Sequence, residues 1–249
     1  DTVLSPRAVS HAVLESQNSS TDLLTVIPKR IATCMAERLM FPFIDWMSYC
    51  WMPMRTAHAS KNPHLSATFG QFIFFKRIAY EFMGGHKAIS DNPLDDFELG
   101  RLAKKVGLKW KLLKGTNQVR VLAYQGNRAA FRAISRSIFP VFYYRTSVFA
   151  ALSAVVLGLG LLPPVTVVVG VITYPQAGSS LLMASASTGM VATTWIISYR
   201  TFQHKGVLAL LFPISLVLMM MVALHSMASY SRGATDWKGR KLSKRKIRL

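Results

Sequence analysis

The sequence predicts an α/β domain followed by transmembrane helices, and three observations lead to this fold class. Residues 1–140 alternate short strand and helix patterns and hold every acidic residue except Asp236. Residues 141–231 consist almost entirely of apolar runs long enough to span a bilayer. Residues 232–249 form a basic tail. Of the 249 residues, 51% are hydrophobic, a share that few soluble domains reach.

The charge of the chain favours a membrane over a nucleic acid as its partner. Lys and Arg number 30 against 11 Asp and Glu, a formal net charge of +19. Basic residues collect on the cytoplasmic flanks of membrane segments and gain from anionic headgroups. A nucleic-acid partner is not expected, because the charge lies largely beside apolar runs and no recognition motif is present. The two cysteines, Cys34 and Cys50, form no CxxC and argue against a disulfide framework or a cysteine metal site.

The first elements are short. The chain starts at Asp1 within what resembles the end of a strand, so we expect that an upstream part is missing. Ser5-Pro6 predicts the N-cap and first position of a helix that buries Ala8, Val9, Ala12 and Val13. Residues 23–27 are rich in strand formers and stop at Pro28.

Residues 31–54 form an unusual segment rich in Met, Phe, Trp and Tyr. Pro42, Pro53 and several charges interrupt it, so it is too broken to span a bilayer. Its Trp and Tyr content predicts a segment that lies at the membrane interface. An ordinary core helix is the alternative that the pattern leaves open.

The rest of the α/β domain continues to alternate. Apolar periodicity and glycine stops predict strands at 72–75, 108–112 and 119–122 and helices at 77–83, 95–106 and 127–139. Gly84-Gly85 ends the first of these helices, and Gly107 ends the second. The elements are all short enough for one compact domain.

Three apolar blocks follow, at 147–173, 177–199 and 207–230, and each is long enough to cross a membrane. Pro163-Pro164 interrupts the first block, which makes it the candidate for a re-entrant or hairpin segment. The tail carries eight basic residues, and both the tail and the α/β domain are expected in the cytoplasm. Three full crossings would separate them, so the number of crossings stays open.

An acidic pair opens the helix at 95–106. Asp95 and Glu98 have the spacing of a capping box, which accounts for Asp95 without any function. Asp96 then remains free in the first turn, where a carboxylate can act as a general base toward a hydroxyl. An ordinary acidic first turn is the alternative.

Two further patterns could contact a substrate. Gly84-Gly85 would let a ligand approach the backbone closely, with His86 beside it, although a helix end explains the glycines equally well. Arg128, Arg132 and Arg136 recur every four residues and share one helix face. Guanidinium groups in such a row suit phosphate oxygens, of a nucleotide or of lipid headgroups.

The order of these motifs resembles membrane-bound family 2 glycosyltransferases, and most of all the hopanoid-associated and carotenoid glycosyltransferases of bacteria. The resemblance covers nearly the whole chain and rests on these segments: Gly70-Gln71, Gly84-Gly85, Leu94 to Arg101, Val119-Arg120, Tyr124 to Gly126, and Asp236 to Arg240 after the last apolar block. It implies the C-terminal half of a GT-A fold, a nucleotide-sugar donor such as a UDP-sugar, a lipid acceptor and a divalent metal, Mg²⁺ or Mn²⁺.

The resemblance also implies roles for single residues. Asp1 matches the last Asp of the metal-binding Asp-x-Asp motif, and Asp96 matches the catalytic base. The acceptor side would comprise Gly70, Gln71, Gly84, Gly85, His86 and Asp95. Arg128, Arg132 and Arg136 would lie near the diphosphate. Ser137 stands where many family members have Trp, and this departure argues against a processive synthase.

The resulting expectation is an inverting glycosyltransferase in the bacterial inner membrane, a multi-pass protein with its catalytic domain in the cytoplasm. It would move a sugar from a nucleotide to a hydroxyl of a membrane lipid or isoprenoid. We expect the chain to be inactive without upstream donor-binding strands. The alternatives are a processive polysaccharide synthase and a non-catalytic membrane scaffold or lipid-binding protein.

Overall fold

The computed structural model describes residues 2–90, 94–122, 124, 126–173, 178–233, 236–237 and 240–241. The chain divides into two compact units. The first comprises residues 1–33 and 47–125, and the second comprises residues 34–46 and 126–249. The helix predicted at 127–139 therefore belongs with the apolar helices, so the first unit ends before the boundary predicted at residue 140.

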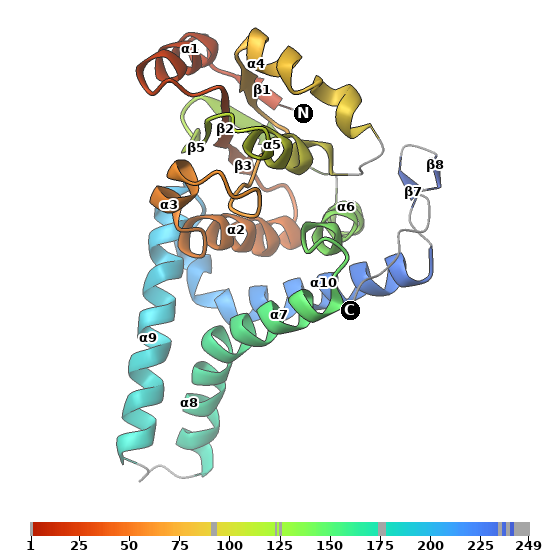
Figure 1. Cartoon of the computed structure of the whole chain (residues 1–249). Coiled ribbons are helices and arrows are strands. Elements are labelled where there is room, and N and C mark those ends of the chain that lie inside the picture. The colour runs from red at the N-terminus through yellow and green to blue at the C-terminus, as the bar shows by residue number, and fades with distance from the viewer. Residues whose placement is uncertain are drawn as a thin grey trace. The chain divides into compact units, whose positions relative to one another are not determined.

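The first unit contains two small mixed sheets (Figure 1). In one, β6 (Val119–Leu122) lies between β1 (Thr2–Leu4), to which it is antiparallel, and β3 (Lys29–Ile31), to which it is parallel. In the other, β2 (Leu23–Ile27) lies between antiparallel β4 (Ile73–Phe75) and parallel β5 (Trp110–Lys114). All five residues of β2 are buried, as expected for a central strand covered on both faces.

Short helices accompany these sheets. They are α1 (Ala8–Asn18), α3 (Met54–Ala59), α4 (Arg77–Phe82), the 3₁₀ helix η1 (Gly85–Ile89) and α5 (Asp95–Lys105). Ala12 of α1 packs on Leu24, Val26 and Val119 to form a core between helix and strands. The predicted strands and helices between residues 72 and 122 are confirmed within one or two residues.

The start of α1 differs from the prediction. The helix begins at Ala8, because Ser5 is engaged elsewhere: its N–H donates to the carbonyl of Gln118 at 2.8 Å, and its hydroxyl donates to the side chain of Gln118. The predicted core face is also only half right. Ala8 and Ala12 are buried, whereas Val9 is 56% exposed.

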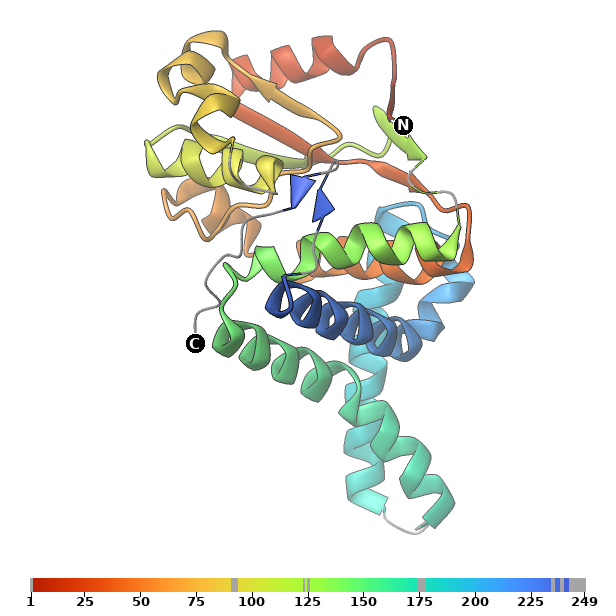
Figure 2. The same ribbon diagram turned by 90° about the vertical axis from the view of Figure 1, so that its right-hand side faces the viewer.

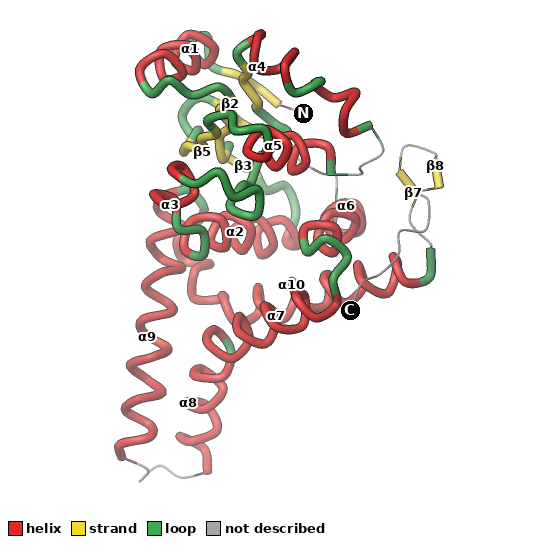
Figure 3. Tube along the Cα trace, viewed as in Figure 1, coloured by secondary structure: helices red, strands yellow, loops and turns green. Residues whose placement is uncertain are grey.

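The second unit is almost wholly helical (Figures 2 and 3). Its elements are α2 (Met35–Cys50, up to Trp46 in this unit), α6 (Asn127–Val141), α7 (Thr146–Gly160), α8 (Leu162–Thr173), α9 (Gly178–Thr201), η2 (Gly206–Leu211), α10 (Phe212–Ser231) and the strand pair β7 (Asp236–Trp237) and β8 (Arg240–Lys241).

Two helical segments are long and apolar enough to cross a bilayer, Gly178–Thr201 and Gly206–Ser231. Helices α7 and α8 pass the same test only as a pair bent by 42°, which fits a broken span or a re-entrant segment. The bend falls at Leu161, and Pro163-Pro164 occupy the first turn of α8, where their missing N–H groups break no helical hydrogen bond. These segments match the three predicted apolar blocks and are consistent with a membrane protein.

Helix α2 packs as a core helix in the second unit. Trp46 stacks on Trp195 of α9 with ring centroids 4.9 Å apart, and its indole N–H donates to Thr194 at 2.9 Å. Asp45, fully buried, accepts a 2.8 Å hydrogen bond from His204. This burial favours the core-helix alternative for residues 37–46 of the 31–54 segment, whereas Tyr49 is 44% exposed.

Candidate functional site

Asp96 lies in the first turn of α5 and is held by the backbone. Its Oδ2 accepts a hydrogen bond from the N–H of Gly70 at 3.0 Å, and its Oδ1 accepts one from the N–H of Phe97 at 2.8 Å. A Cβ atom on residue 70 would lie 3.1 Å from Oδ2, so Gly70 is the residue that lets the turn approach this closely. The structure therefore brings together two of the predicted site residues, Gly70 and Asp96.

A threonine that the sequence reasoning missed holds the Gly70 turn in place. The hydroxyl of Thr25, on central strand β2, accepts the N–H of Phe69 at 3.0 Å and lies 3.0 Å from the carbonyl oxygen of Phe72. Phe69 also packs edge-on against Phe97, with ring centroids 6.4 Å apart. The turn is thus fixed to the sheet on one side and to α5 on the other. A buried Thr within an otherwise apolar strand was the available signal.

Burial changes the acidity of Asp96. The side chain is partly buried, and this desolvation raises its pKa from 3.8 to about 6. The N–H groups of Phe97 and Gly70 oppose the change by stabilising the carboxylate, while the charge of Asp95 adds to it. At pH 7 the carboxylate is largely ionised, and it is far more basic than an ordinary aspartate.

The predicted capping box is wrong. Asp95 is the first residue of α5, and its Oδ1 accepts the N–H of Asp96 at 3.0 Å. Glu98 pairs instead with Arg101 at 2.5 Å, because that side chain lies one turn further along the same face. Asp95 is exposed and adjoins Asp96, which leaves its predicted place beside the acceptor untested.

Gly84 and Gly85 form a rigid corner after α4. Both adopt positive φ angles, +80° and +53°, which confirms the predicted helix end. A Cβ on Gly85 would lie 2.5 Å from the ring of Tyr80. The Tyr80 hydroxyl lies 2.7 Å from Nδ1 of His86 and accepts the N–H of His86 at 3.1 Å. Packing against Tyr80 therefore explains Gly85 without any ligand.

The three arginines form one exposed row on α6. Arg128, Arg132 and Arg136 are all exposed, as the spacing predicted. The buried residues of α6 include Ala130, Ala133, Ile134 and Phe139. The helix packs on α10, where the N–H of Phe139 donates to Ser226 at 3.1 Å. These arginines belong to the second unit, and Asp96 belongs to the first.

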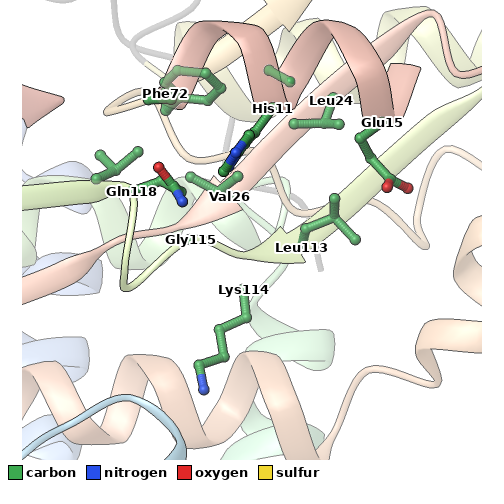
Figure 4. Close-up of a pocket in the computed structure, with 12 residues that line it drawn as sticks. His11, Glu15, Leu24, Val26, Phe72, Leu113, Lys114, Gly115 and Gln118 are labelled. Carbon is green, nitrogen blue, oxygen red and sulfur yellow. The ribbon is translucent and has the colours of Figure 1, made fainter. Parts of the chain in front are cut away.

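The first unit also has a cleft of about 230 Å³ between α1 and strands β2 and β5 (Figure 4). It arises where α1 presents the small residues Ala8 and Ala12 to the sheet. Its floor is apolar, and Lys114 points away from the other labelled side chains in Figure 4. None of the predicted site residues lines this cleft, so the cleft is not part of the predicted site. Gln71, which is predicted on the acceptor side next to Gly70, is exposed.

The predicted metal site can be tested only in part. Asp1, the predicted ligand, lies outside the described residues. Among the residues that the structure describes, no three His, Cys, Asp or Glu side chains come close enough to hold a metal ion.

The chain was compared with protein families, curated proteins and solved structures. No family model, curated protein or solved structure matches it. The mixed α/β architecture and the two candidate spans are observed in the structure. The GT-A fold and the glycosyltransferase family rest on the residue pattern alone.

Proposed function

We propose that Asp96 is the general base in an inverting transfer of a sugar from a nucleotide donor, such as a UDP-sugar, to a hydroxyl of a membrane lipid or isoprenoid. The observation that supports this most is the carboxylate itself. It is largely ionised at neutral pH, has a pKa of about 6 and is held by backbone N–H groups in a domain joined to candidate membrane spans.

The reaction needs one proton transfer and one displacement. Asp96 takes the proton of the acceptor hydroxyl as that oxygen forms a bond to the anomeric carbon. The bond from that carbon to the nucleotide diphosphate breaks, and its electron pair stays on the diphosphate oxygen. Attack opposite the leaving group inverts the configuration. A base with a pKa close to the working pH accepts the proton well and remains mostly ionised beforehand.

Other residues would position the two substrates. The Gly70-Gln71 turn, which adjoins the carboxylate, is the natural contact for the acceptor hydroxyl. Gly84, Gly85, His86 and Asp95 remain proposed acceptor-side residues on the strength of the family resemblance. Arg128, Arg132 and Arg136 remain proposed contacts of the diphosphate on the strength of the same resemblance, since guanidinium groups suit phosphate oxygens. A divalent metal, Mg²⁺ or Mn²⁺, is proposed from the resemblance only.

The proposed location is the cytoplasmic side of a bacterial inner membrane. The basic residues beside the apolar helices support this side. There, a water-soluble nucleotide sugar and a lipid hydroxyl can both reach one carboxylate.

The central test compares Asp96→Asn with Asp95→Asn in the protein purified with every residue that its gene encodes and reconstituted in lipid. Transfer of labelled sugar from nucleotide donors to extracted bacterial lipids is measured. We expect a loss of at least about a hundredfold for Asp96→Asn, with donor affinity unchanged, and a small effect for the exposed neighbour. Full transfer by Asp96→Asn would refute the assignment, and failure of the wild type to bind any nucleotide sugar would favour a non-catalytic protein.

The arginine row is tested separately, because the same row could bind lipid headgroups. Arg132→Gln should raise the donor KM by about tenfold, the usual cost of one phosphate contact. Arg120→Gln, which removes an exposed arginine from β6 in the first unit, is the matched control. An unchanged donor KM for Arg132→Gln would assign the row to lipid headgroups.

A further inference from the structure

Helix α4 exposes two large apolar side chains. Ile78 is 83% exposed and Phe82 is 69% exposed, the highest values for large apolar residues in the described part of the first unit. They stand four positions apart and so share one face, one turn above the other. Such adjacent exposure differs from the scattered single apolar residues that every protein surface carries.

The core of the first unit does not require this face. Ala79 and Met83, also four positions apart, are the buried residues of α4 and its end, 6% and 5% exposed. Tyr80 packs on Phe75, with ring centroids 5.3 Å apart, and bonds to His86, so the helix is held firmly from its inner side. Ile78 and Phe82 are therefore presented outward on a rigid support.

The surroundings of this face are mostly basic. Arg77 is 89% exposed, and Lys87 on η1 is exposed as well. The acidic residue of α4, Glu81, pairs with Arg77 at 2.8 Å. Apolar side chains next to exposed cations suit the border between acyl chains and anionic headgroups.

The first unit is joined through its own chain to the unit that carries the candidate spans. The chain passes between the units three times, at residues 33–34, 46–47 and 125–126, and the second unit carries the candidate spans. Tethering of this kind raises the effective concentration of the membrane, so two side chains suffice where a free protein would need more.

We infer that Ile78 and Phe82 insert into the anionic surface of the same bilayer that holds the apolar helices of this chain. The surface of α4 is thus a lipid contact of the α/β unit. This inference does not depend on the proposed sugar transfer, because it uses only the exposure and charge of α4.

The test uses the full protein in bilayers with and without anionic lipid. In a background of Cys34→Ser and Cys50→Ser, which removes the two native thiols, a nitroxide is attached to Phe82→Cys. Leu14→Cys on α1 is the matched control, since Leu14 is also an exposed apolar residue, at 54%. Ile78→Cys gives a second, independent reporter on the same face.

Collision of the nitroxide with oxygen and with a water-soluble nickel complex reports its depth. We expect positions 78 and 82 to favour oxygen strongly over nickel, more so with anionic lipid, and position 14 to remain accessible from water. Equal nickel access at positions 82 and 14 would overturn the inference. Dipolar broadening of the nitroxide spectrum at position 82 that increases with protein density and does not depend on lipid charge would also overturn the inference. It would show that this face of α4 contacts a second copy of the chain.

Discussion

Replacing Asp96 by Asn is expected to stabilise the protein while it removes the proposed activity. Burial raises the pKa of this carboxyl from 3.8 to about 6, so the folded state resists its ionisation. Folding stability then falls as the pH rises from about 4 to about 6, where the folded protein holds a proton that the unfolded chain has lost. Above pH 6 the full cost is present.

The size of the effect follows from the change in pKa. A pKa change of about 2 corresponds to about 3 kcal/mol of folding free energy. Solvent screening at this partly exposed side chain reduces the figure to about 1–2 kcal/mol. The Asn side chain resembles the protonated acid, because one oxygen still accepts from Gly70 or Phe97. At pH 7.5 the gain corresponds to an increase of about 2–8 °C in the unfolding temperature.

The assay is thermal unfolding of wild type and Asp96→Asn in the same lipid at pH 4 and pH 7.5. We expect the variant to gain stability at pH 7.5 and to match the wild type at pH 4, where the wild-type carboxyl is protonated. An equal gain at both pH values would show that ionisation is not its cause. A loss of stability at pH 7.5 would show that the ionised carboxylate stabilises the fold. The reasoning from its raised pKa would then be refuted.

Three further substitutions test the surroundings of the site and the second unit. Gly70→Ala should displace the Asp96 carboxylate, because the new Cβ would lie 3.1 Å from Oδ2, and the pH profile of transfer should shift with less than about 1 kcal/mol lost in stability. Gly100→Ala should cost more than about 2 kcal/mol, since its Cβ would lie 2.0 Å from the Thr68 hydroxyl, and chemical denaturation should show partial recovery on adding Thr68→Ala. Asp45→Asn should lower the free energy of unfolding of the second unit by about 2 kcal/mol, as measured by denaturation in detergent, because it weakens a buried hydrogen bond to His204. An unchanged denaturation curve would mean that this hydrogen bond does not stabilise the second unit.

Regular periodicity made most elements of the fold predictable. Alternation of Trp110 and Leu112 with lysines placed β5, and both of these residues are buried. The apolar blocks after residue 140 were equally predictable, because their length and apolar composition identify candidate spans. The start of α1 was missed because Ser5 bonds to Gln118, more than a hundred positions away, and no local pattern records such a partner.

The site was predictable only as separate pieces. Asp96 stood out because it lies in the first turn of a helix. The sequence predicts a free Asp96 beside a capping box of Asp95 and Glu98, whereas the capping box does not form and the Asp96 carboxylate accepts from Gly70 and Phe97. Thr25 was overlooked, since a lone hydroxyl in a buried strand gives no hint that it will hold a turn some 44 positions later. Tertiary hydrogen bonds of this kind require the pairing of β2 with its neighbours, which sequence periodicity does not encode.

The threefold passage of the chain between the units has a consequence for synthesis. During translation, α2 emerges long before α9, which supplies packing partners for Trp46. Strand β2 cannot form its parallel pairing until β5 is made, some 85 residues later. The first unit has all its residues once residue 125 is made, whereas Trp46 of the second unit lacks its stacking partner until Trp195 is made. Helix α9 is thus both a candidate membrane span and the packing partner of α2, which is made 148 positions earlier at the bonded pair Trp46 and Thr194.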